Sequence, residues 1–421
     1  MNTISRQQRL GTAEACGSRV HVPAWRRLPA RLLARGVEGV LERMSHGSLE
    51  VHLPDASRVA GRGFAGGPAA TLVLHRWRTL ARLALRGDLG LAESYRDGDW
   101  SCSDLCALLE LGIHNEPAWQ DALGIPWPLR AVSRLAHLRR DNTREGSRRN
   151  IAYHYDLGNE FYGKWLDADL NYSSGLYRRA EATLEQAQSA KLERVLELLD
   201  LPPDASAHVL EVGCGWGALA CLLAARGRAR VTGVTLSAQQ LAHGRDRVAR
   251  KRLEAQVDLR LQDYRDVEGS YDRIVSIEMI EAVGERHWPR YFEMLRERLR
   301  PGGAAVLQAI TIADDCFGRY RRNPDFIQHF IFPGGMLPSP ATLARQAAQA
   351  GLSLTVAETF GASYAATLAE WRRRFQRAWP AIAALGFDEP FRRLWEYYLC
   401  YCEAGFRCGR VDVGLYRLTP N

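Results

Sequence analysis

Apolar-rich runs of strand length alternate with helical patterns through the second half of the chain. The runs lie at 208–212, 230–236, 257–261, 271–277 and 303–310, and each is long enough for a buried strand. Strands that alternate with helices in this way predict a mostly parallel, doubly wound α/β sheet. The spacing also predicts an amphipathic helix over 181–199, which ends before Pro202-Pro203.

A smaller unit is predicted ahead of this sheet. The pattern predicts a helix over 28–44 and strands over 49–53 and 70–74. No catalytic constellation occurs there, so a packed α/β domain is the simplest interpretation. The predicted organisation is a tail without fixed structure at 1–20, a small N-terminal α/β domain at 21–115, a basic linker at 116–149 and a main domain at 150–421.

The linker carries a concentrated positive charge. Seven arginines lie between Arg130 and Arg149, against Asp141 and Glu145, which leaves a net charge of +5. A solvated connector is one interpretation of this segment. The other is contact with anionic lipid headgroups, with Trp127 and nearby leucines as apolar anchors.

Composition narrows the class of protein. The 421 residues are 46% apolar, and no apolar run approaches the roughly 20 residues of a membrane-spanning helix. The N-terminal stretch lacks the apolar core of a signal peptide. The nine cysteines lack partners at zinc-binding spacing, so we expect reduced thiols, a cytoplasmic location and no metal site. The formal charge of +8 is compatible with an anionic membrane or a nucleic acid, or it simply reflects an arginine-rich composition.

The stretch 211–217, Glu-Val-Gly-Cys-Gly-Trp-Gly, joins the first predicted strand of the main domain to a helical pattern. Glycine adopts the backbone angles of a tight strand-to-helix turn and leaves room for a ligand against the backbone. The spacing differs from the Gly-x-Gly-x-x-Gly turn that binds dinucleotides. The stretch instead resembles the turn of S-adenosylmethionine-dependent methyltransferases, which have an acidic residue at the position of Glu211. The alternative is a tight turn without a ligand.

Polar residues recur at the ends of the other predicted strands. Thr235, Asp263, Glu281 and Gln308 each fall at or just beyond a carboxyl end. Ligands of doubly wound sheets bind in the crevice beyond these ends. The coincidence of these residues with the glycine turn predicts a cofactor site.

Several motifs resemble those of the cyclopropane-fatty-acyl-phospholipid synthases, a family that includes the mycolic acid cyclopropane synthases. The similarity runs from about His154 to the C-terminus. The motifs are His154-Tyr155-Asp156-Leu157-Gly158-Asn159, the glycine stretch, Gly233-Val234-Thr235-Leu236-Ser237, Gln262-Asp263-Tyr264-Arg265-Asp266, Phe332-Pro333-Gly334-Gly335 and Phe360-Gly361. The resemblance implies a Rossmann-like methyltransferase sheet behind a small N-terminal domain with a lipid, membrane or dimer role.

The resemblance also implies a reaction. A methylene group from S-adenosylmethionine would add to a cis double bond of a phospholipid acyl chain, through a carbocation, to form a cyclopropane. In the family, a bound bicarbonate removes the proton. The family binds this bicarbonate with four side chains, and the matching positions here are Glu281, Tyr364, Ser174 and Gln308. Ser174 stands in place of a cysteine and Gln308 in place of a histidine. We expect bicarbonate to be retained, and the rival is that Glu281 itself takes the proton.

A further set of positions matches the S-adenosylmethionine site of the family. These residues are Tyr172, Ser173, Gly213, Gly215, Gly217, Thr235, Leu236, Gln240, Asp263 and Tyr264. Asp263 and Tyr264 would lie at the edge and the face of the adenine.

Other functions remain open at this point. A relative could make methylene- or methyl-branched acyl chains, a small-molecule methyltransferase could act on soluble substrates, and a lipid-binding protein could retain an inactive cofactor pocket. The expected partner is a phospholipid bilayer with unsaturated acyl chains, with no nucleic acid, and a homodimer is the expected assembly if the chain oligomerises. The expected location is cytoplasmic, peripheral on the inner face of the membrane.

Overall fold

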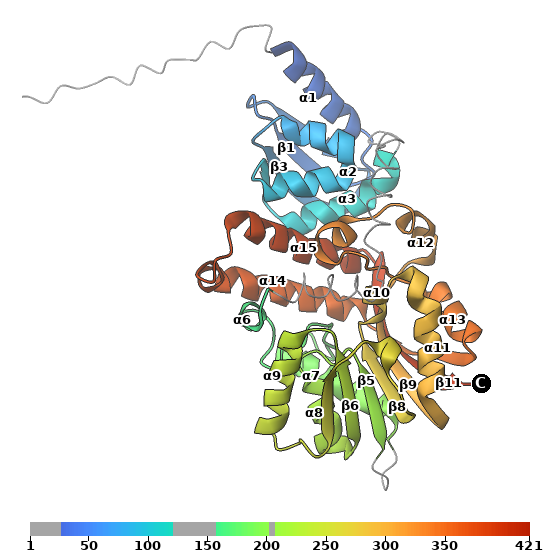
Figure 1. The fold of residues 1–421 in the computed structure, drawn as a ribbon. Helices are drawn as coiled ribbons and strands as arrows, with labels where there is room; N and C mark the ends of the chain where they lie inside the picture. Colours follow the sequence, from blue (N-terminus) through green and yellow to red (C-terminus); the bar gives the residue numbers. More distant parts are fainter. Residues whose placement is uncertain (1–26, 121–156, 202–206) are drawn as a thin grey trace, which may run out of the picture.

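The computed structural model describes residues 27–120, 157–201 and 207–421, which form a small upper unit and a larger lower one (Figure 1). The predicted linker from residue 121 onward and His154 therefore lie outside the described residues. Within the described ranges, no helix combines the length and the apolarity that spanning a bilayer requires.

The N-terminal unit is a four-stranded sheet with three helices. Its elements are α1 (Arg27–Leu41), β1 (His46–His52), β2 (Arg58–Arg62), β3 (Ala65–Leu74), α2 (Arg78–Arg96), β4 (Trp100–Cys102) and α3 (Leu105–Gln120). The strand order is β2-β1-β3-β4, with β1 parallel to β3 and the other pairs antiparallel. The predicted helix and the two predicted strands overlap α1, β1 and β3. The linker predicted to start at 116 overlaps the end of α3.

The main domain is a seven-stranded sheet with helices on both faces. Its strands are β5 (His208–Val212), β6 (Arg230–Thr235), β7 (Val257–Leu261), β8 (Tyr271–Ile277), β9 (Leu299–Ile312), β10 (Leu352–Thr359) and β11 (Val411–Pro420). The order is β10-β11-β9-β8-β5-β6-β7, and only β11 runs antiparallel to its neighbours. The predicted parallel, doubly wound sheet is confirmed, with all five predicted strands in place.

The helical elements of this domain follow the predicted alternation. They are α6 (Asn159–Tyr162), α7 (Leu184–Leu199), α8 (Ala218–Gly227), α9 (Ala238–Arg250), η2 (Tyr264–Asp266), α10 (Ile280–Val283), η3 (Glu285–His287), α11 (Trp288–Arg298), α12 (Asp314–Tyr320), η4 (Ile327–Ile331), α13 (Pro340–Gln349), α14 (Gly361–Ala383) and α15 (Glu389–Arg407). The helix predicted over 181–199 begins at Leu184, because Thr183 and Gln186 form a capping box.

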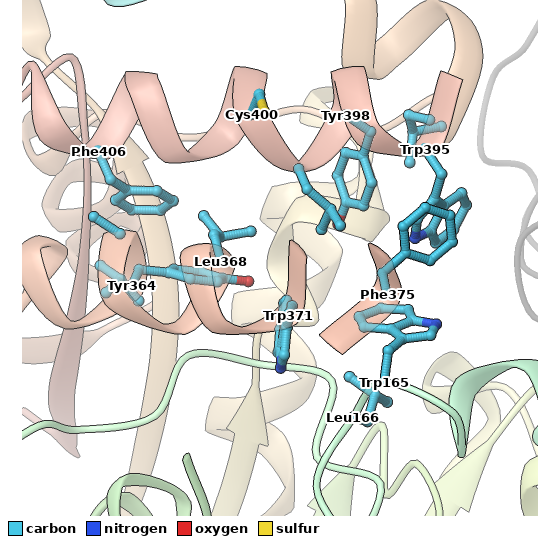
Figure 2. Close-up of a cluster of buried hydrophobic side chains, with 14 of the residues drawn as sticks. Trp165, Leu166, Tyr364, Leu368, Trp371, Phe375, Trp395, Tyr398, Cys400 and Phe406 are labelled. Atoms are coloured by element: carbon cyan, nitrogen blue, oxygen red, sulfur yellow. The ribbon is translucent and has the colours of Figure 1, made fainter. Parts of the chain in front are cut away.

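Helices α14 and α15 lie between the sheet and the N-terminal unit (Figure 1). Aromatic side chains fill the space between them, and Tyr364, Trp371, Trp395, Tyr398 and Phe406 belong to this cluster (Figure 2). Paired aromatic rings add packing energy beyond the area that they bury. The cluster thus forms a dry layer above the carboxyl ends of the strands.

The N-terminal unit docks onto the other side of α15. Arg393 donates to the carbonyl of Trp100 at 2.7 Å and lies over the ring of Tyr95, 4.1 Å from its centroid. Tyr95 in turn donates to Glu396 at 3.1 Å. These contacts hold the two units as neighbours and leave a hollow between them.

Candidate active site

The glycine turn lies between β5 and α8, where the sequence predicts it. Gly213, Gly215 and Gly217 have φ values of 82°, 50° and 79°, in the left-handed region that favours glycine. A Cβ atom on Gly215 would meet nothing within 4 Å, whereas one on Gly217 would press against Leu259 and Gly244. Gly215 therefore borders open space for a ligand, and Gly217 is needed for helix packing.

One cavity of about 2030 Å³ joins the glycine turn to the other strand ends. Of the ten predicted cofactor residues, eight line it: Tyr172, Ser173, Gly213, Gly215, Thr235, Leu236, Gln240 and Tyr264. Gly217 is not among the lining residues, and neither is Asp263. Asp263 instead caps η2 and forms a two-point ion pair with Arg265, so its carboxylate is already used.

Two buried ionisable groups, Glu211 and Lys191, lie beside the glycine turn. Glu211 lines the cavity, and its Oε2 atom has no hydrogen-bond partner. Burial raises the pKa of Glu211 to about 8, against the attraction of Lys191. Lys191 donates to the hydroxyl of Ser173 at 2.7 Å, and burial lowers its pKa to about 8.

These residues fit S-adenosylmethionine. The orphaned oxygen of Glu211 offers an acceptor to a cationic ligand, and the space beside Gly215 accepts a group that lies against the backbone. Asn159, from the motif near the start of the main domain, accepts a hydrogen bond from Trp216 at 2.7 Å and so braces the turn. We assign the predicted cofactor site to this end of the cavity.

A second carboxylate, which the sequence analysis missed, lies at the centre of the predicted catalytic residues. Glu278 Oε1 accepts from the backbone N–H of Ser174 at 2.9 Å and from the Gln308 amide at 2.7 Å. Glu278 Oε2 accepts from the Tyr364 hydroxyl at 2.7 Å. Three of the four predicted catalytic residues, Ser174, Gln308 and Tyr364, thus donate hydrogen bonds to Glu278, which was not predicted.

The backbone of Glu278 is strained. Its φ is 48°, in a region that residues with a Cβ rarely adopt. Such strain persists only where the surrounding structure enforces it, and it concentrates at functional sites. Glu278 follows β8 directly, and its own N–H donates to the carbonyl of Gln308 at 2.8 Å. The strained turn is what aims the carboxylate at its donors.

Glu281 lies beside Glu278 but is bonded differently. Its Oε1 accepts from the N–H of Ile310 at 2.6 Å, and its Oε2 has no hydrogen-bond partner. Burial, followed by the charge of Glu278, raises the pKa of Glu281 to about 8. Burial also raises the pKa of Glu278, but its donors and Lys191 oppose the shift. Three donors thus favour the ionised form of Glu278, whereas Glu281 has one.

Bicarbonate stays a prediction, and the donors expected for it have other partners among the described residues. Its expected donors were Tyr364, Ser174, Gln308 and backbone N–H groups. Tyr364, Gln308 and the N–H of Ser174 all donate to Glu278, and the N–H of Ile310 donates to Glu281. The hydroxyl of Ser174, expected to replace a cysteine thiol, donates to the carbonyl of Gly175 at 2.8 Å. The Glu278 carboxylate thus takes the donors that an anion would need.

One signal for Glu278 was present in the sequence. Two acids three residues apart, Glu278 and Glu281, follow the same strand end. Only Glu281 matched a family position, and nothing in the local pattern shows that the earlier residue turns back toward Gln308. That turn depends on a positive φ outside glycine, which sequence patterns do not reveal.

Comparisons with known proteins identify the family of the chain. The family model described as mycolic acid cyclopropane synthetase matches residues 142–415. The chain is 39% identical over 407 residues to the tuberculostearic acid methyltransferase UfaA1 of Mycobacterium tuberculosis. This match covers 93% of each of the two chains. It is 36% identical over 365 residues to the cyclopropane-fatty-acyl-phospholipid synthase of Escherichia coli, covering 84% of this chain and 89% of the relative.

A solved structure shares the fold of the main domain. The mycolic acid cyclopropane synthase CmaA1, complexed with SAH and CTAB, is 30% identical and gives a TM-score of 0.59. The match covers 64% of this chain and 97% of that one.

Gly215→Val should weaken S-adenosylmethionine binding at least tenfold, because the branched side chain enters the open space and resists a φ of 50°. Isothermal titration with the purified chain measures the effect. The control is Gly269→Val, which also has a positive φ and open surroundings but lies outside the cavity lining. Equal affinity in a folded Gly215→Val variant contradicts the placement.

Glu281→Gln should stabilise the protein in a pH-dependent way. Because the folded-state pKa is raised from 4.5 to about 8, the stability that Glu281 contributes is present below pH 4.5 and is lost as pH rises toward 8. The variant lacks this loss, so its melting temperature should exceed the wild-type value by a margin that grows to several degrees between pH 5 and 8, then levels off. Glu293→Gln, at an exposed acid, is the control. A margin that does not change with pH contradicts the assignment.

Proposed function

This chain belongs to the mycolic acid cyclopropane synthetase family, and on that premise we propose that it methylates a cis double bond in the acyl chain of a phospholipid. The observation that carries the proposal is a buried carboxylate, Glu278, held by three donors in an apolar cavity that also contains the cofactor residues. We further propose that the lipid is reached at an anionic bilayer surface on the cytoplasmic side, with the basic segment between Arg130 and Arg149 as the contact.

S-adenosylmethionine, when bound, supplies an electrophilic methyl group. The chain's own residues have to place a weak nucleophile, the alkene, in line with that group and keep water away. The glycine turn and Glu211 hold the donor end of the cavity, and Tyr172, Tyr398 and Phe332 line the space beyond it. The hydroxyls of Tyr172 and Tyr398 bond each other at 2.8 Å, so each polar group has a partner within the protein.

The alkene electrons form a bond to the methyl carbon, whose bond to sulfur breaks, and a cation is left on the neighbouring carbon of the lipid. Aromatic faces stabilise such a cation, and an apolar wall prevents its capture by water. A proton must then leave the new methyl group. We assign that proton to Glu278, because it is the carboxylate whose donors favour the ionised form.

Two isomeric products are compatible with this step. If the electrons of the broken C–H bond attack the cation directly, a cyclopropane forms. If a hydride first moves from the methylated carbon to the cation, loss of the methyl proton gives a methylene branch (C=CH₂) on the chain. The first candidate is the methylene-branched chain, because the relative that matches 93% of this chain is named a methyltransferase and not a cyclopropane synthase. The second candidate is the cyclopropane, the product of the Escherichia coli relative.

Product analysis separates these candidates. Lipids from a host without cyclopropane or branched chains, expressing this protein, should show the vinylidene protons of a methylene group in the NMR spectrum. Upfield cyclopropyl protons would instead establish the second candidate. Glu278→Gln, expressed at the same level, is the control and should give neither signal, because its amide cannot accept the proton.

The identity of the base is tested by chemical rescue. Wild-type turnover should be the same in bicarbonate-free buffer and with bicarbonate added, since the donor set is already taken by Glu278. Glu278→Gly should lower the rate at least 100-fold, within the range for a lost general base. Glycine also relieves the φ of 48° and leaves a space among the donors, so added bicarbonate should restore part of the activity.

The matched control is Glu281→Gln, which keeps an acceptor for Ile310 and should show no bicarbonate response. Loss of wild-type activity on removal of carbon dioxide, with recovery on adding bicarbonate, would return the base to the bound anion and refute the role of Glu278.

A further inference from the structure

The cavity does not end at the catalytic residues. It continues past α15 into the N-terminal unit, where aliphatic side chains of α1, α2, α3 and the sheet line it. We call this part the N-terminal sleeve, represented by Leu33, Val37, Leu72, Leu83, Leu109 and Ile113. At about 2030 Å³, the whole cavity is about twice the upper size of a drug-sized site, so the cofactor and one acyl chain do not account for its reach into a second domain.

The side chains of the N-terminal unit do not fill the N-terminal sleeve. Leu32, Leu33 and Leu85 line it and are 66%, 40% and 53% exposed, although they belong to helices that pack on the sheet. Buried apolar side chains normally interlock at high density. Large aliphatic side chains that border a hollow indicate an apolar ligand rather than a defect of packing.

A polar belt lies where the N-terminal unit meets the main domain. It consists of Asp88, Glu116, Arg319, Arg322, Asp325 and Arg410, all of which line the same cavity. Glu116 pairs with Arg319 at 2.9 Å and also with Arg410, and Tyr401 donates to Asp325 at 3.2 Å. A belt with both charge signs suits the phosphate, esters and head of a lipid and is unsuited to a methylene chain.

The cavity therefore has aliphatic side chains in the N-terminal unit, charged side chains at the junction of the two units and aromatic side chains in the main domain. A diacyl glycerophospholipid has a matching arrangement when its two chains point in opposite directions from the glycerol. We propose that the N-terminal sleeve binds the second, unreactive acyl chain of the phospholipid whose unsaturated chain enters the catalytic end. This inference rests on the proposed function, and it adds a binding site in the N-terminal unit and a requirement for a two-chain substrate.

The physical reason for such a site is the cost of lifting a lipid out of a bilayer. A chain that leaves the hydrocarbon layer for water loses favourable free energy with every CH₂ group. The sleeve provides an apolar environment for that chain while the other one reacts. Without the sleeve, the enzyme would have to leave one chain in water or in the membrane.

Two glycines allow the sleeve to be filled without a clash. Gly36 in α1 and Gly112 in α3 line the cavity, and a Cβ on either would meet nothing within 4 Å. Phenylalanine at these positions would occupy the hollow. Gly39 in α1 has equally open surroundings but does not line the cavity, so Gly39→Phe is the matched control.

The assay compares two lipids in one neutral detergent: palmitoyl-oleoyl phosphatidylethanolamine and oleoyl lysophosphatidylethanolamine. For the wild type, kcat/KM should be at least tenfold higher with the two-chain lipid. The reason is that several CH₂ groups of its second chain are buried in the N-terminal sleeve, and each contributes favourable free energy. Gly36→Phe with Gly112→Phe should lower the two-chain value at least tenfold and change the one-chain value less than twofold. Gly39→Phe should change neither.

An equal fall for both lipids would overturn the proposal, because the sleeve would then hold the far end of the reactive chain. Equal wild-type rates for the two lipids would overturn it as well. Absence of methylated product from either lipid in the wild type would instead refute the proposed function.

A second measurement uses the unaltered chain and does not depend on turnover. A phosphatidylethanolamine with a photoreactive diazirine on its saturated chain should label residues of α1, α2 or α3 after irradiation, as read by peptide mass spectrometry. Labels confined to the main domain would contradict the proposal.

Discussion

Burial of carboxylates in an apolar cavity is the constraint on which the site depends. Glu211, Glu278 and Glu281 all lie at the carboxyl ends of strands, with one buried cation, Lys191, among them. A buried charge is tolerated only where donors or an opposite charge replace its water. For Glu278 the donors come from β9, α14 and the segment before α7, so three separate parts of the chain must be in register to keep one carboxylate ionised.

The same constraint explains the layers above the sheet. The pKa shifts require that water be scarce, and the aromatic cluster between α14 and α15 covers the site on that side (Figure 2). Tyr364 serves both roles, because its ring packs 4.4 Å from that of Phe406 and its hydroxyl donates to Glu278. The N-terminal unit, fixed to α15 through Arg393, encloses the remaining side. The dry layer and the catalytic donor are thus parts of one packed element.

The fold could be predicted from the sequence because its signals are local. Apolar runs such as 257–261 and the glycine turn specify strands and their order along the chain, and the family motifs supply the cofactor end. The centre of the site could not be predicted in the same way. Contacts between distant segments decide that Ser174 donates its N–H, and not its hydroxyl, to Glu278. They also decide that the hydroxyl of Tyr364 donates to Glu278 and not to a bound anion. The cavity through the N-terminal unit is likewise a property of packing, since its leucines follow an ordinary amphipathic pattern.

A side-chain base differs from a bound anion in how it is restored after each turnover. A bicarbonate that accepts a proton can leave the site and be replaced, whereas Glu278, the base that we propose, has to release its proton in place. After the proton transfer both Glu278 and Glu281 are protonated, and one proton must go to solvent as the lipid leaves. The donors around Glu278 and the charge of Lys191 favour its ionised form, while Glu281 has one donor and an unpaired oxygen. The proton therefore leaves from Glu278 and remains on Glu281, which returns the pair to its starting state without a second base.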